Sequence, residues 1–182
     1  MSSKNSSKLI TSILGYLRIN NRIDSKYLEY IKSCINECIL IINDLDSFVY
    51  IYRKYTYKLD FLNNEIYTNF LSGCDSYYLI ACTFGSRIQK IINELSITDS
   101  EKMVIFDATL SAILEEKAND FEKGLGSNLT KRFCPGYSNT NIEDIKIIYN
   151  ELEAYKIGIE VLDSCMLNPQ KSMIGIIGIK NN

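Results

Sequence analysis

The stretch "YYLIACTFG", residues 77–85, is an apolar run of strand length that ends at a glycine. A short continuous apolar run bounded by a turn residue is typical of a strand covered on both faces. We therefore predict a buried strand that feeds a turn at Gly85. The segments on either side of it set the fold class.

Segments with helical periodicity precede and follow this run. Their apolar residues recur every three or four positions, over 9–17, 27–45, 88–95, 103–121 and 142–152. Asp24 can cap the second of these helices. Thr98 with Glu101 has the spacing of a capping box before the fourth, and Thr140 with Glu143 has it before the fifth.

Three further segments are rich in β-branched and aromatic residues. "SFVYIYRKYTYKLDFLNNEIY", residues 47–67, predicts two strands joined as a hairpin or loose meander. "IGIEVLDSCML" (157–167) and "SMIGIIGI" (172–179) predict two more strands. Because regular βαβ spacing is absent, we predict an α+β fold, a mostly antiparallel sheet with flanking helices. We expect one domain over residues 1–182, frayed over 1–12.

Composition excludes several classes of function. The chain has 182 residues, a net charge of −2 and scattered cations, which argues against nucleic-acid binding. Its N-terminal apolar stretch is too short for a membrane span and lacks a signal-peptide cleavage pattern, so we expect a cytoplasmic protein. It has six cysteines without a C-x-x-C pair and no histidine. Zinc binding and His-dependent catalysis or metal ligation by this chain are therefore not expected.

The stretch "KRFCPGYSNT", residues 131–140, holds one of the two prolines, followed directly by a glycine. Pro135 biases Cys134 toward an extended conformation, so that the Cys134 backbone can meet a partner. Gly136 permits a φ that other residues resist, or a close approach by a ligand. Arg132 offers a planar fork for a carboxylate, and Tyr137 a flat face with a hydroxyl. An ordinary strand-to-helix turn is the alternative.

The order of several motifs resembles a known family. These motifs are Gly73-Cys74-Asp75, Thr83-Phe84-Gly85, Asp107 with Glu115, Arg-x-x-Pro-Gly-Tyr at 132–137, and Ser-Cys-Met-x-x-Pro-x-x-Ser at 164–172. Together they resemble the reactivation domain of cobalamin-dependent methionine synthase, in the short form that occurs as a separate subunit. The resemblance runs from about Ile13 to Ile179.

The resemblance implies a twisted antiparallel sheet that binds S-adenosylmethionine in an extended groove. It implies that oxidised cob(II)alamin, carried by a methionine synthase chain, takes one electron from flavodoxin or another donor. S-adenosylmethionine then methylates the reduced cobalt. The protein would be an accessory component without acid–base catalytic residues of its own, because cobalt(I) is the nucleophile and the domain positions the methyl group. Cobalamin and its histidine ligand belong to the partner chain.

Site residues follow from the motif positions. The resemblance implies that Arg132 holds the ligand's carboxylate, that the Cys134 backbone contacts S-adenosylmethionine, that Gly136 allows close approach, and that Tyr137 lies beside the sulfonium. Glu115 matches the acidic ligand-binding residue.

Several positions leave alternatives open. Depending on the register, the position of the acidic residue falls at Ser111 instead of Glu115. Phe84 stands where the family has leucine, and Asp163 where it often has glutamate. An alternative function is a docking module for a corrinoid protein that does not bind S-adenosylmethionine. A third is a structural interaction domain.

Overall fold

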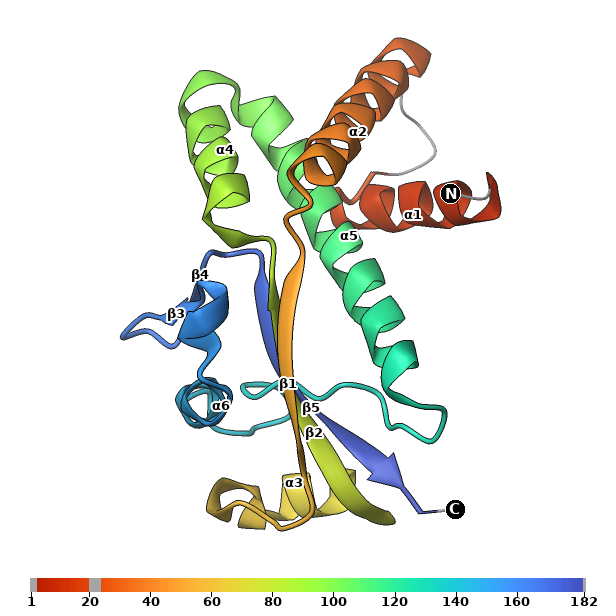
Figure 1. Ribbon diagram of the computed structural model, residues 1–182. Helices are drawn as coiled ribbons and strands as arrows, with labels where there is room; N and C mark the ends of the chain where they lie inside the picture. The colour runs from red at the N-terminus through yellow and green to blue at the C-terminus, as the bar shows by residue number, and fades with distance from the viewer. Residues whose placement is uncertain (1–2, 20–23, 182) are drawn as a thin grey trace. The chain divides into compact units, whose positions relative to one another are not determined.

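The computed structural model describes residues 3–19 and 24–181, and it divides the chain into two compact units (Figure 1). The helical unit comprises residues 1–47 and 86–120, and the sheet unit comprises 48–85 and 121–182. The chain combines helices with a mostly antiparallel sheet, so the predicted α+β class is confirmed. A single domain over 1–182 stays a prediction.

The helical unit is built from amphipathic helices. They are α1 (Ser3–Tyr16), α2 (Ser25–Leu45), α4 (Gly85–Thr98) and α5 (Ser100–Leu125), whose last residues belong to the sheet unit. The predicted apolar faces are buried, as at Ile31, Ile88 and Phe106. An ion pair of 2.7 Å between Lys102 Nζ and Glu37 Oε1 links α5 to α2.

The sheet unit centres on the predicted buried strand. It forms β2 (Cys74–Thr83), which pairs antiparallel with β1 (Val49–Tyr55) on one side and β5 (Ser172–Lys180) on the other. A small hairpin of β3 (Glu160–Val161) and β4 (Leu167–Asn168) precedes β5. Residues 157–167 are therefore not the single strand that the sequence predicted, because a turn interrupts them.

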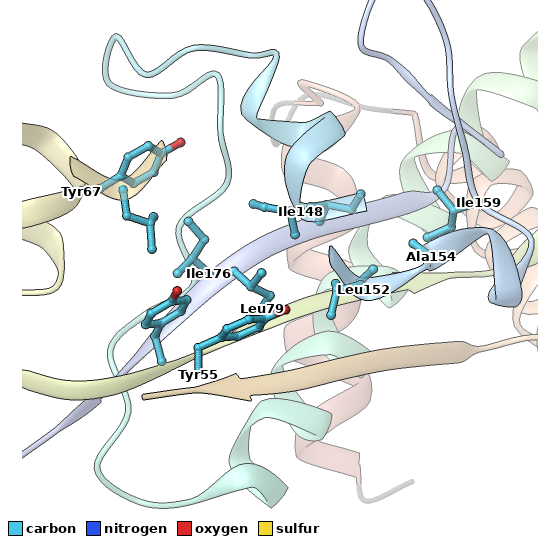
Figure 2. Close-up of a cluster of buried hydrophobic side chains, with 12 residues drawn as sticks. Tyr55, Tyr67, Leu79, Ile148, Leu152, Ala154, Ile159 and Ile176 are labelled. Atoms are coloured by element: carbon cyan, nitrogen blue, oxygen red, sulfur yellow. The ribbon is translucent and has the colours of Figure 1, made fainter. Parts of the chain in front are cut away.

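Twelve buried residues form the core of the sheet unit (Figure 2). The strands contribute alternate residues such as Leu79 and Ile176, as the period-two geometry of a sheet requires. Helix α6 (Asp144–Leu152) adds Ile148 and Leu152, and the 3₁₀ turn η2 (Ala154–Ile157) adds Ala154. The core thus fixes α6 and the 3₁₀ turn that follows it against the sheet.

The predicted second strand within residues 47–67 is wrong. After β1 the chain forms the 3₁₀ turn η1 (Asp60–Asn63) and helix α3 (Glu65–Phe70). Asn64 caps α3, since its side-chain oxygen accepts a 2.9 Å hydrogen bond from the Tyr67 amide. Leu62 and Tyr67 are fully buried, so tertiary packing prevails over the local β propensity.

Neither predicted capping box forms. Thr98 is the last residue of α4 and donates to the Glu94 carbonyl, while Asp99 accepts from the Lys102 amide and caps α5. Helix α6 begins only at Asp144. Asp24 precedes α2 as predicted, but its side chain makes no capping hydrogen bond.

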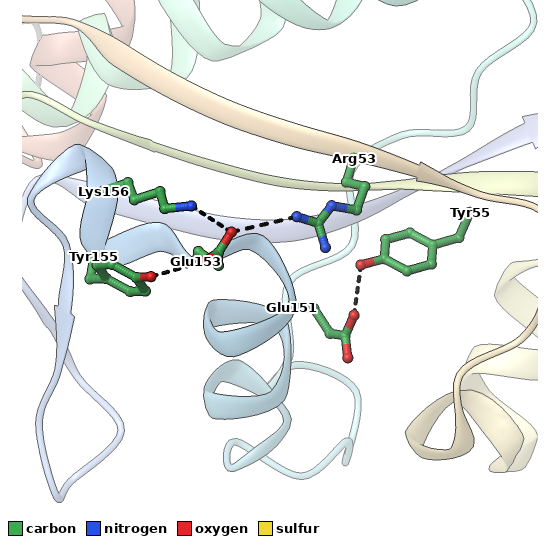
Figure 3. Close-up of polar contacts among 6 residues, drawn as sticks. All are labelled: Arg53, Tyr55, Glu151, Glu153, Tyr155 and Lys156. Carbon is green, nitrogen blue, oxygen red and sulfur yellow. Dashed lines mark hydrogen bonds and ion pairs between the residues drawn. The ribbon is translucent and has the colours of Figure 1, made fainter.

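Polar contacts connect β1 with the end of α6 and with the segment that follows it (Figure 3). Glu153 accepts from Lys156 Nζ at 2.6 Å and from the Tyr155 hydroxyl at 2.8 Å, and its carboxylate lies 3.8 Å from Arg53. The Tyr55 hydroxyl donates to Glu151 at 2.8 Å. Since the Glu153 contacts are solvent-exposed, they add little stability and mainly hold η2 in register with β1.

A buried hydrogen bond lies where α3 meets the start of α6. The hydroxyl of Tyr67 donates to Asp144 Oδ2 at 2.8 Å, and both residues are buried. The Tyr67 ring packs edge-on against Phe133 at a centroid distance of 5.4 Å. Burial raises the pKa of the Asp144 carboxyl, although the hydrogen bond from Tyr67 opposes that shift.

Replacing Tyr67 with phenylalanine should destabilise the chain by about 1–3 kcal/mol, because the ring stays while the buried Asp144 loses its donor. Chemical unfolding at neutral pH measures this change. Tyr57→Phe, at a side chain that is 63% exposed, is the matched control and should shift the free energy of unfolding by less than about 0.5 kcal/mol. Equal effects of the two substitutions would contradict a stabilising role for the buried bond.

Asp144 should also make stability depend on pH. The pKa of Asp144 in the folded chain lies above the usual 3.8. At pH values between the pKa of the unfolded chain and that of the folded chain, the folded chain therefore binds more protons. The free energy of unfolding of the wild type, relative to Asp144→Asn, should therefore fall as pH rises above 3.8 and level off once the carboxyl of the folded chain is ionised. Unfolding both proteins in urea across this range tests the sign, and a relative stability that rises with pH would contradict it.

Candidate functional site

The motif at 132–137 continues a segment that is paired to the edge of the sheet. Thr130 N donates to Gly178 O, and the Phe133 and Ile176 backbones exchange hydrogen bonds of 2.9 and 2.8 Å. Bridges at Leu129–Ile179 and Phe133–Ile176 are antiparallel. The segment therefore lies along β5 and enters the motif in a position fixed by the sheet.

Side chains alternate across this segment. Phe133 packs with Tyr67 and Phe70 against the core that contains Ile174 and Ile176. Arg132 lies over Gly175 instead, where a Cβ atom would come within 2.7 Å of the arginine Cγ and 2.9 Å of its Cδ. Glycine at 175 thus allows the Arg132 side chain to lie flat on the strand.

Gly178, three residues farther along β5, also allows a close approach. A Cβ there would come within 2.6 Å of Cys74 Sγ and 3.0 Å of Thr130 Cγ2. Gly175 and Gly178 belong to the stretch "GIIGIK", residues 175–180, for which the sequence predicted no role. Glycines inside a strand signal a close approach by another chain segment, and that signal could have located this pairing.

The guanidinium of Arg132 is held by a carboxylate of the same unit. Arg132 Nη1 forms an ion pair with Glu122 Oε1, near the C-terminal end of α5. The two side chains are only 8% and 14% exposed. Glu122 was not predicted, since no sequence pattern relates it to Arg132.

The turn after Pro135 is closed by Thr140. Its hydroxyl accepts from the Gly136 amide at 3.0 Å and donates to the Tyr137 carbonyl at 2.8 Å. Gly136 has a φ of 88°, and Ser138 and Asn139 are also left-handed, at 53° and 65°. The glycine is therefore required by the turn itself, and Thr140 closes this turn rather than capping α6.

The remaining residues of the motif differ in exposure. Pro135 is buried and Cys134 is half-buried, whereas the Tyr137 side chain is 71% exposed at the turn. The structure thus brings Arg132, Cys134, Gly136 and Tyr137 into one rigid segment. It places Glu115 and its alternative Ser111 on the part of α5 that belongs to the helical unit.

Each unit also has a pocket lined by other residues. In the helical unit, a pocket of about 340 Å³ is lined by Asp107 and Ser111 together with apolar residues of α5 and the end of α1. In the sheet unit, a pocket of about 380 Å³ lies between α3 and the start of β2, with Lys58 and Cys74 in its lining. Lys58 donates to Thr68 there at 2.8 Å.

The candidate segment offers groups suited to ligand recognition. Among residues 3–19 and 24–181, no group of three or more Cys, Asp or Glu side chains is placed to hold a metal ion. The six cysteines are free thiols, and Cys34, Cys38, Cys82 and Cys165 are buried. In the same part of the chain, no helix combines the length and apolar character needed to cross a membrane. Arg132 and Tyr137 supply a cation and an exposed ring.

Comparison with solved structures finds a similar fold. The structure described as "Crystal Structure of the MetH Reactivation Domain bound to AdoHcy" matches with a TM-score of 0.61 and 13% sequence identity, over 92% of this chain and 68% of the other. No protein-family profile matches the sequence, and no curated protein matches it either. At this identity, the likeness establishes the fold alone.

Thr140→Val should loosen the turn, because valine keeps the shape of threonine but leaves the Gly136 amide without its acceptor. We expect a loss of about 1–3 kcal/mol in the free energy of unfolding. Thr68→Val, which removes a hydroxyl from an exposed helix position, is the control and should have an effect within about 0.5 kcal/mol of zero. A Thr140 variant as stable as the wild type would show that the hydroxyl does not hold the turn.

Proposed function

We propose that this chain is a cytoplasmic, stand-alone reactivation subunit of cobalamin-dependent methionine synthase that binds S-adenosylmethionine through residues 132–137. It would present the methyl group to the cobalamin of a partner chain after a one-electron donor, such as flavodoxin, has reduced the cobalt. The single domain and the docking to a corrinoid-bearing chain are parts of this proposal.

The observation that carries the proposal is the rigid Arg132–Tyr137 segment on the edge of β5. It combines a guanidinium suited to a carboxylate with an exposed aromatic ring, and the backbone that carries both is held by pairing with β5 and by a closed turn. The fold is that of a domain solved with AdoHcy, a molecule that shares its amino-acid and adenosine portions with S-adenosylmethionine. This likeness supports the ligand class.

Roles within the site follow from the chemistry of each residue. Arg132 would bind the ligand's carboxylate, the Cys134 backbone would contact the ligand, and Tyr137 would lie against the sulfonium, where a ring face favours positive charge. Gly136 would let the backbone of the turn approach the ligand closely. The role of Glu115, which belongs to the helical unit, stays a prediction of the resemblance.

The alternative is a docking module that holds a corrinoid protein without binding S-adenosylmethionine. The exposed Tyr137 and the internal pairing of Arg132 with Glu122 favour it, because that ion pair already satisfies part of the arginine's hydrogen-bonding capacity. Calorimetric titration with S-adenosylmethionine separates the two functions. Heat of binding supports the first, and its absence at near-millimolar ligand with folded protein supports docking.

Arg132→Ala should abolish measurable S-adenosylmethionine binding, with a loss in affinity of about thirtyfold or more, since a charge-assisted pair to the carboxylate contributes about 2 kcal/mol or more. Lys131→Ala removes the same charge from the exposed neighbour and is the matched control. It should leave affinity within about twofold, because an exposed charge contributes little. Unchanged affinity of folded Arg132→Ala would contradict the site.

The partner is tested separately by co-purification with a cobalamin-binding methionine synthase chain. Both leading functions require a complex. If none forms, with the partner folded and loaded with cobalamin, the structural interaction domain is favoured instead.

A further inference from the structure

The pocket between α3 and the start of β2 lies outside the segment at 132–137 and has no part in the proposed function. Its volume of about 380 Å³ falls within the range of about 300–1,000 Å³ that is usual for small-molecule sites. All of its lining residues lie between positions 56 and 77, which belong to the sheet unit. The pocket is therefore complete without the helical unit.

Hydrogen bonds from the core fix the loop that carries Lys58 along one wall of this pocket. The Tyr77 hydroxyl donates to the Tyr57 carbonyl at 3.0 Å and accepts from the Leu59 amide at 3.3 Å. These two bonds hold the backbone on either side of Lys58, and Tyr77 is itself buried in the core of the sheet unit. The backbone position of Lys58 is thus set before any ligand binds.

A second wall is the chain that leads from α3 into β2. The Cys74 amide donates to the Leu71 carbonyl at 3.0 Å, and Gly73 has a φ of 75°, so the chain turns tightly between helix and strand. Cys74 Sγ lies over Gly178 of β5, where a Cβ atom would come within 2.6 Å of the sulfur. Both walls therefore belong to the fold, and the pocket is formed in advance.

Lys58 supplies a positive charge to this pocket. Its Nζ donates to Thr68 Oγ1 at 2.8 Å, and within residues 3–19 and 24–181 no carboxylate lies at ion-pair distance from it. An ammonium group has three N–H donors, so donors remain for a further acceptor. The Thr68 hydroxyl, which accepts from Lys58, can donate its own hydrogen to that acceptor. The two side chains together suit an anion.

Two other groups of the lining affect the charge that an anion meets. Burial raises the pKa of the Cys74 thiol above its usual 9.0, so the thiol is uncharged at neutral pH. Asp75 carries a negative charge but is exposed to solvent, where salt screens it. Asp75 forms no ion pair with Lys58, so it leaves the cation available to a ligand.

We propose that this pocket is a separate binding site, which takes a compact molecule carrying a carboxylate or a phosphate. The anionic group accepts hydrogen bonds from Lys58 and Thr68, and Tyr57 and Leu71 of the lining contact the rest of the molecule. Carboxylate and phosphate share the chemistry that this site recognises, since both present charged acceptor oxygens to an ammonium group.

NMR titration of the whole chain with inorganic phosphate and, separately, with butyrate tests the site. We expect saturable shifts of the amides of residues 57–58 and 68–76 with at least one probe. Saturation by phosphate alone indicates a phosphate ligand, and saturation by butyrate alone indicates a carboxylate with an apolar part. Shifts that stay linear with both probes, or that fall outside these residues, overturn the proposal. S-adenosylmethionine is absent, so this result does not bear on the proposed function.

Substitutions of opposite sign test the role of charge. Lys58→Met should weaken binding of the probe by about fivefold or more, because it removes the charged donor. Asp75→Asn should strengthen binding by about twofold, because it removes a negative charge from the lining. Lys54→Met, at an exposed lysine of β1 outside the lining, is the matched control and should leave the affinity unchanged. Equal affinities of Lys58→Met and Lys54→Met, or weaker binding by Asp75→Asn, overturn the anion site.

Discussion

The backbone pairing between Phe133 and Ile176 is the constraint on which the candidate site depends. Two reciprocal hydrogen bonds extend the sheet beyond β5 and set the register of the whole segment. That register directs Phe133 into the core and Arg132 onto Gly175. A slip of one residue would exchange the two side chains, burying a guanidinium among aromatic rings. Site and core are therefore specified by the same bonds.

The turn that follows is fixed from both of its ends. Before it, the sheet holds Phe133; after it, Tyr67 and the core hold the start of α6 at Asp144. Thr140 closes the turn between these anchors with its hydroxyl. Because the backbone at Tyr137 is already constrained, binding through this residue costs little further backbone entropy, which suits a recognition surface.

The central strand, the amphipathic helices and the α+β class could be predicted because burial leaves a period in the sequence. The motif at 132–137 could be found from its Pro-Gly pair. The second strand predicted within residues 47–67 does not form, although the aromatic residues there favour a strand locally. Capping by Asn64 and burial of Leu62 stabilise helical turns instead. The Glu122–Arg132 pair could not be predicted, since it exists only once the chain turns after α5 and pairs with β5.

Hydrogen–deuterium exchange with and without saturating S-adenosylmethionine tests most directly that residues 132–137 form the binding site. The proposed site predicts slower exchange in peptides covering 131–142, with no change over the β3–β4 hairpin at 160–168. Protection that falls instead on the pocket beside Lys58 and Cys74, while 131–142 exchanges as in the free protein, would contradict the account.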